Sequence, residues 1–263
     1  MDPAIFVEWV RKGANAQEDR ALWDYNIDIG ESKNTNYILS RIVKEFKVSV
    51  NGFFKEDVAS GFISDLGKLG LAIGGEALKT GRNALGAIGI VNTIRLLSGS
   101  REKNIKGVFR KDKYSAGFLI PVDSFTSFFG LTNRRTDLIA IQLILKGEDE
   151  PHLDIYACGI ESKFVSGKFE HDQAKEALKQ AKDSIDLFKE LIDISLKNGG
   201  MPERLGLLSI LKFGLRISSP SQQREIVEWI KIEQRVYKSV LRGNYEYKTN
   251  KFDAVVVSTE GEF

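Results

Sequence analysis

The chain has few of the residues that build disulfide-linked or metal-stapled folds. Of its 263 residues, one is cysteine, two are histidine and five are proline. The single Cys158 excludes an internal disulfide framework and is more consistent with a core position than with a nucleophile; it fits a reducing cytoplasm, the location we expect. His152 and His171 are not arranged with cysteine, or with each other, in a zinc-ligand spacing, so the sequence predicts no zinc site.

Long apolar runs are also lacking. No stretch approaches 18 uninterrupted apolar residues, so no transmembrane helix is expected. The first residues, MDPAIFVEWVRKG, have no basic start followed by an apolar segment, which excludes a secretory signal. The glycine-rich stretch 56–98 has a helical apolar pattern and contains no GxxxxGK followed by Ser or Thr, which excludes a phosphate-binding loop of that type.

Charge of one sign is not in large excess, because the net charge is only +2. Its distribution is more informative than its sum. The segment 101–113 carries six bases and two acids, and Arg134 and Arg135 precede an acid. Such clusters suit the phosphate backbone of a nucleic acid, although a solvated loop looks the same. The candidate nucleic-acid contacts are Lys106, Arg110, Lys111, Arg134 and Arg135.

Two strand-like runs surround a short turn of charge, glycine and proline: DLIAIQLIL at 137–145 and HLDIYACGI near 153–161. This pattern predicts an antiparallel hairpin with its tip near Asp149. Asp137 then lies opposite Glu161, with side chains about 4.5–5.5 Å apart. Lys163 shares their face, because strand side chains alternate with a period of 2. Two facing carboxylates repel unless a hard cation such as Mg²⁺ lies between them.

The acid-x-Lys triplet at Glu161 is one of four in a chain that is 28% charged. The four are Glu31-Ser32-Lys33, Glu45-Phe46-Lys47, Glu161-Ser162-Lys163 and Glu246-Tyr247-Lys248. Only the third triplet ends a strand-like run and precedes a long helical pattern. It is also the only one with an acid, Asp137, directly opposite it in the predicted hairpin. The alternative reading of Glu161 and Lys163 is a solvated ion pair at a strand end.

The arrangement Asp137, Glu161-x-Lys163 resembles the PD-(D/E)xK nuclease superfamily over about residues 56–258, with Thr136 where the family motif has proline. The resemblance implies a restriction-endonuclease-like α/β fold: an αβββαβ core with a mixed central sheet, additional helices and an N-terminal extension. We therefore expect an extension or small subdomain at 1–55 and a nuclease-like domain at 56–263. The expected elements are strands near 118–122, 137–145, 153–161 and 252–258, and helices near 171–197, 202–217 and 221–242.

The resemblance also assigns roles. Asp137, Glu161 and the backbone carbonyl of Ser162 would hold Mg²⁺ or Mn²⁺, with Glu76 as a further candidate ligand. Lys163 would hold or activate the attacking water, and Gln173 would position that water or Lys163. A solvated Gln173 in the first helical turn is the alternative, and an exposed helical Glu76 is the commoner case.

The segments GFLIPVDSF, RRTDLIAIQL and GIESKF also resemble nuclease-type domains of DNA-translocating ATPases in bacterial phage-defence systems. We therefore expect a Mg²⁺-dependent endodeoxyribonuclease acting on DNA, an effector of anti-phage defence or restriction, with an ATPase or translocase subunit or domain as a partner. Because the chain ends straight after the strand expected at 252–258, we also expect it to be an excerpt of a longer protein. The alternative is a non-catalytic nucleic-acid-binding or protein-docking module that keeps the nuclease fold.

Overall fold

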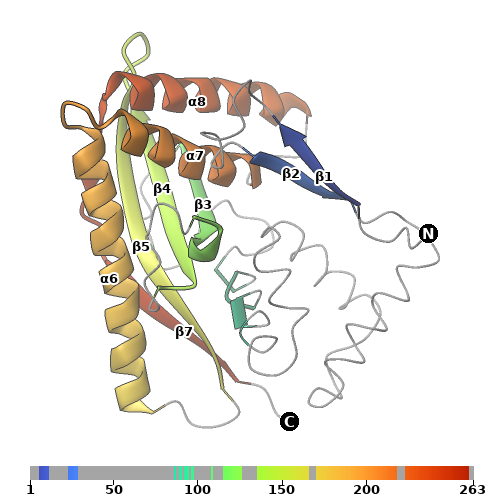
Figure 1. Cartoon of the computed structure of the whole chain (residues 1–263), viewed down its shortest axis with the longest axis vertical. Helices are drawn as coiled ribbons and strands as arrows, with labels where there is room; N and C mark the ends of the chain where they lie inside the picture. The colour runs from blue at the N-terminus through green and yellow to red at the C-terminus, as the bar shows by residue number, and fades with distance from the viewer. Residues whose placement is uncertain are drawn as a thin grey trace.

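The computed structural model describes residues 6–11, 23–28, 115–125, 135–165, 170–217 and 223–260, together with 108 and helical residues between 86 and 97, namely 86, 89–90, 92–94 and 96–97. The described part is mixed α/β, with a mixed sheet of five strands and helices (Figure 1). Within that part, none of the helices combines the length and the apolar character needed to span a bilayer.

The sheet is built around a long hairpin. β4 (Leu138–Lys146) pairs antiparallel with β3 (Ala116–Pro121) on one side and with β5 (His152–Val165) on the other. A short 3-10 helix, η2 (Val122–Phe125), follows β3. β6 (Tyr245–Lys248) and β7 (Ala254–Glu260) both run parallel to β5, β6 along its first half and β7 along its second.

The predicted hairpin register is confirmed. Leu138 pairs with Ile160 and Lys146 with His152, so the pairing is symmetric about residue 149. The turn needs glycine at 147, where φ is 67° and an added Cβ would lie 2.8 Å from the carbonyl oxygen of Glu150. The hairpin therefore fixes which side chains face each other along its whole length.

Three helices cover one face of the sheet. They are α6 (His171–Ser195), α7 (Met201–Ile217) and α8 (Gln223–Arg242), close to the predicted spans. Figure 1 shows α6 running along β5, with α7 and α8 lying across the end near the hairpin tip. The apolar stripe of α6 is buried at Ala177, Ala181, Ile185, Phe188 and Ile192.

Both faces of β4 and β5 are buried, which explains the almost unbroken apolar run LIAIQLIL. Odd-numbered residues such as Ile139, Ile141 and Ile155 pack with the helices. Even-numbered residues such as Leu138 and Ile160 join the cluster on the other face, which includes Leu97 and Val108. The side chain at any position on β5 is thus assigned to one face by its parity.

Two parts of the chain differ from the prediction. A single final strand was expected at 252–258, whereas the structure has β6 as well as β7. Near the N-terminus, β1 (Phe6–Arg11) and β2 (Trp23–Asp28) form an antiparallel pair that the sequence did not predict. The boundary expected at residue 55 lies outside the described residues.

Candidate active site

Asp137 and Glu161 come from the open end of the hairpin. Because Leu138 pairs with Ile160, continuing the register by one residue places Asp137 opposite Glu161. Both are odd-numbered, and strand parity assigns odd positions to the α6 face, as it does for Ile139. Asp137 Oδ2 accepts a hydrogen bond of 2.8 Å from the backbone N–H of Ser162. The two predicted acids are therefore brought to one corner of the sheet.

Glu161 is a buried carboxylate with two donors. Its side chain is 2% exposed, and Oε1 accepts a 2.6 Å hydrogen bond from Lys163 Nζ. Its Oε2 accepts a 3.2 Å hydrogen bond from Gln180 Nε2. Lys163 itself is 37% exposed, so the ammonium group joins the buried acid to the surface.

Burial raises the pKa of Glu161 above its usual value of 4.5. The hydrogen bond and charge of Lys163 and the backbone of Asp137 act in the opposite direction and lower it. Desolvation thus outweighs the stabilisation supplied by these neighbours.

The corner also presents the Ser162 carbonyl. In a strand the N–H and C=O of one residue point to the same strand edge. Since the Ser162 N–H reaches Asp137, the Ser162 carbonyl points toward the β4 side as well. Its hydroxyl lies on the opposite face and accepts a 2.9 Å hydrogen bond from Thr93. Two carboxylates and a carbonyl are the oxygen ligands that Mg²⁺ and Mn²⁺ take, so the residues fit such an ion.

Two side chains of α6 hydrogen-bond to the backbone of the residues just before β4 and hold that segment against the helix. The Thr136 N–H donates to Ser184 Oγ at 2.9 Å, and Gln180 Nε2 also donates to the carbonyl of Arg135. Proline has no N–H, so it could not make the first of these bonds. Threonine at 136 therefore supplies a backbone donor to α6 that proline would lack.

The close approach of α6 depends on Gly159. A Cβ on this residue would lie 2.3 Å from the carbonyl oxygen of Ala181. Gln180 is the neighbour of Ala181 on α6, and Glu161 is two residues beyond Gly159 on β5. The glycine therefore sets the distance at which the helix brings its amide to the acid.

The other predicted site residues have varied outcomes. Gln173 is exposed in the first turn of α6, and it is Gln180, two turns further along, that reaches Glu161. Arg135 is half-buried and contributes its backbone carbonyl. Glu76, Lys106, Arg110, Lys111 and Arg134 lie outside the described residues. Gln180 was missed, although its spacing of three from Ala177 places it beside the buried stripe of α6.

Cys158 behaves as a core residue. Its side chain is fully buried on the face opposite Glu161, and it forms no disulfide. Burial, with a smaller contribution from the charge of Asp253, raises the pKa of its thiol to about 12. The thiol is therefore protonated at neutral pH and is a poor nucleophile, in agreement with the prediction.

No protein-family model, curated protein or solved structure matches this chain. What the site can do rests on its own residues. A buried carboxylate facing a second one, beside a carbonyl and a half-exposed ammonium, could bind a divalent cation and an adjacent phosphate. The same groups could also serve as an internal polar network that binds neither.

Proposed function

We propose that this chain is a metal-dependent nuclease that hydrolyses phosphodiester bonds of DNA, with Mg²⁺ or Mn²⁺ as cofactor. The observation that carries the proposal is the facing pair Asp137 and Glu161 with Lys163 on the same face. The order of elements supports it: three antiparallel strands, helices, then a strand parallel to the third. The finer αβββαβ core of restriction endonucleases is part of this proposal.

Each residue of the site has a separate proposed role. Asp137, Glu161 and the Ser162 carbonyl would hold the ion, which when bound lowers the pKa of a water and neutralises charge on the phosphate. Lys163, half-exposed at the edge of the site, offsets phosphate charge and orients the attacking water. Gln180 holds Glu161 Oε2 and keeps the carboxylate aimed at the corner. Lys106, Arg110, Lys111, Arg134 and Arg135 are proposed contacts to the DNA backbone.

We place this activity in anti-phage defence or restriction, with an ATPase or translocase subunit or domain as a partner; the support is the resemblance of the segments around the two acids. Metal binding is expected to strengthen as pH rises, because the raised pKa of Glu161 makes the ion compete with a proton.

A second candidate is a non-catalytic nucleic-acid-binding or docking module with the same fold. The specific observation in its favour is that protein donors already occupy the acids: Ser162 N–H at Asp137, and Lys163 and Gln180 at Glu161. Such a network is satisfied without an ion. In this reading the corner stabilises the junction of β4, β5 and α6 and carries no chemistry.

Incubation of the full chain with supercoiled plasmid separates the two candidates. The nuclease is expected to nick or linearise it with Mg²⁺ or Mn²⁺ and to leave it intact with EDTA. Linear duplex, single-stranded DNA and RNA in parallel define the substrate class. If cleavage requires the partner ATPase, titration calorimetry still decides: absence of Mg²⁺ and Mn²⁺ uptake that depends on Asp137 and Glu161 leaves only the module.

Gln180→Met is expected to slow cleavage by roughly 10- to 100-fold, as loss of a group that orients a metal ligand typically does. Methionine has a similar size but donates no hydrogen bond to Glu161. Gln173→Met is the matched control, because Gln173 is exposed in the first turn of the same helix. Rates at saturating Mg²⁺ should differ between the two variants. If Gln173→Met is the slower enzyme, the amide from the helix start is the functional one.

A further inference from the structure

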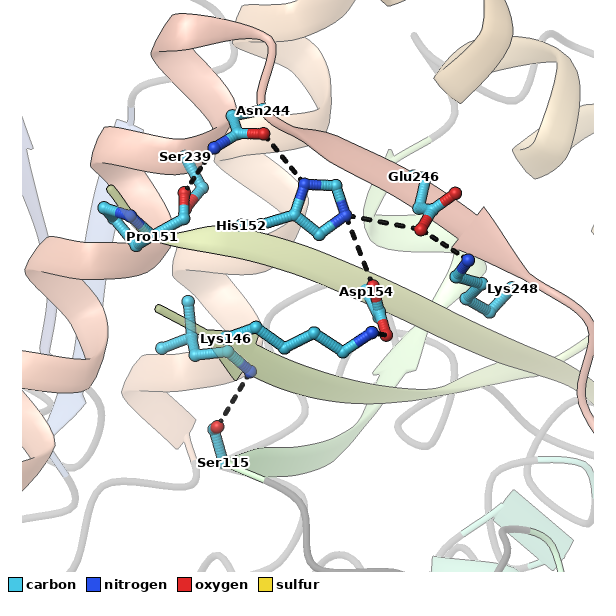
Figure 2. Close-up of polar contacts among 10 residues, drawn as sticks. Ser115, Lys146, Pro151, His152, Asp154, Ser239, Asn244, Glu246 and Lys248 are labelled. Atoms are coloured by element: carbon cyan, nitrogen blue, oxygen red, sulfur yellow. Dashed lines mark hydrogen bonds and ion pairs between the residues drawn. The ribbon is translucent and has the colours of Figure 1, made fainter. Parts of the chain in front are cut away.

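A second polar cluster lies at the other end of β5, beside the hairpin tip. His152 and Asp154 come from the start of β5, and Glu246 comes from the neighbouring β6 (Figure 2). One ligand atom from each lies within 4.8 Å of the others. Asp154 and Glu161 are seven residues apart, about 23 Å along a strand, and their parity places them on opposite faces. The cluster is thus separate from the candidate active site.

The imidazole of His152 is held in one orientation by Asn244. The Asn244 side-chain amide donates a 2.9 Å hydrogen bond to the carbonyl of Pro151, so its nitrogen faces that carbonyl. Its oxygen then faces His152 Nδ1, at 2.8 Å. Because an amide oxygen only accepts, Nδ1 carries the hydrogen. In the neutral ring the lone pair is therefore on Nε2, which points at the two acids in Figure 2.

Asp154 supplies an independent sign of a ligand. Its side chain is 2% exposed, and its Oδ1 is buried without a hydrogen-bond partner among the residues that the structure describes. This oxygen lies 3.3 Å from His152 Nε2. A hydrogen on Nε2 would still leave Asp154 Oδ1 without a hydrogen bond, because Nε2 would donate it to Glu246 Oε1, also at 3.3 Å. A cation between the three atoms satisfies both carboxylates at once.

Two of the three ligand-atom separations suit a small, nitrogen-tolerant ion. Two ligand atoms bound to Zn²⁺ at 2.0–2.1 Å and a tetrahedral angle lie about 3.3 Å apart. The separations from His152 Nε2 to Asp154 Oδ1 and to Glu246 Oε1 are both 3.3 Å. An imidazole whose other nitrogen is fixed by an amide is also the usual setting of a metal-bound histidine.

We propose that His152, Asp154 and Glu246 bind one divalent transition-metal ion of the zinc class, with water as the remaining ligand. The ion would fasten the start of β6 to β5. Its competitors are two lysines: Lys146 Nζ lies 2.5 Å from Asp154 Oδ2, and Lys248 Nζ contacts Glu246 Oε1. Asp154 keeps Oδ1 for the ion while Lys146 holds Oδ2. Glu246 is 44% exposed and can turn Oε1 from Lys248 toward the ion.

The test uses the full chain carrying Asp137→Asn and Glu161→Gln, so that metal uptake at the other site does not contribute. Titration calorimetry with Zn²⁺ should give one site, and Co²⁺ should give the visible absorption of a tetrahedral nitrogen–oxygen site. Adding Asp154→Asn should weaken Zn²⁺ binding at least 100-fold and remove the Co²⁺ band. His152→Gln, at a side chain one-third exposed, should do the same without disturbing a buried group.

Two comparisons make the outcome decisive. Lys248→Gln should strengthen Zn²⁺ binding several-fold, because it frees Glu246 and removes a positive charge. Glu228→Gln, which breaks an exposed ion pair with Lys231, should leave binding unchanged. The proposal is overturned if the background protein takes up no Zn²⁺ or Co²⁺. It is also overturned if folded His152→Gln, checked by circular dichroism, binds Zn²⁺ as tightly as its parent.

Discussion

Glu161→Gln is expected to abolish Mg²⁺-dependent cleavage while making the metal-free protein more stable at neutral pH. The variant keeps the shape of the side chain and removes the charge that would balance the cation. Burial raises the pKa of Glu161, so the ionised form is less stable in the folded chain than in the unfolded one. Glutamine carries no such penalty, and Lys163, 37% exposed, can turn to water.

The sign of the pH dependence follows from the direction of that shift. The folded protein keeps the proton on Glu161 to a higher pH than the unfolded chain does. Ionisation of Glu161 therefore lowers the stability of the fold as the pH rises above 4.5, the usual pKa of this carboxyl group. The difference in melting temperature between Glu161→Gln and the wild type should therefore be near zero at pH 4. It should grow with pH and level off above the folded pKa. Thermal unfolding in EDTA measures it.

Saturating Mg²⁺ should reverse the order of stability. An ion that binds only the folded state stabilises the wild type, and the glutamine variant should gain much less. Lys163→Gln is the matched control, because it leaves both carboxylates in place. It should keep Mg²⁺ binding while the cleavage rate falls by roughly 10²–10⁴, as loss of a proton-transfer group does. A wild type whose melting is indifferent to Mg²⁺ and Mn²⁺ contradicts the metal site.

Gly159→Ala is expected to destabilise the fold more than any other single-methyl change at the site. The added Cβ would lie 2.3 Å from the Ala181 carbonyl oxygen and 2.9 Å from its carbon, both backbone atoms of α6. A helix backbone cannot yield as a side chain does, so α6 must move away from β5. Overpacking of this kind costs about 1–3 kcal/mol or more. The shift would also separate Gln180 from Glu161.

Gly86→Ala provides the comparison for that variant. Gly86 is helical and exposed, and a Cβ there meets no atom of the described residues within 4 Å. Alanine should therefore be neutral or stabilise the helix by about 0.5–1 kcal/mol. Chemical denaturation measures both free energies of unfolding. Equal stabilities for the two variants would mean that α6 does not pack on β5 at Gly159.

The sequence by itself determined the hairpin and the acids that it aligns. Two strand-like apolar runs, a glycine turn and a symmetric spacing about residue 149 are local properties, and they specify which residues of β4 and β5 face each other. The apolar period of 171–197 specified α6 and its buried stripe for the same reason. Asp137, Glu161 and Lys163 could therefore be brought together from their positions in the chain alone.

Only the tertiary structure decided which groups from distant segments meet these strands. Gln180 rather than Gln173 reaches Glu161, because Gly159 lets α6 approach β5 at Ala181 and not at the helix start. β6 pairs with the first half of β5, which no local pattern in Tyr245–Lys248 specifies. That pairing brings Glu246 to His152 and Asp154 from more than 90 residues away. Contacts of this kind depend on how whole elements pack, and sequence periodicity describes only one element at a time.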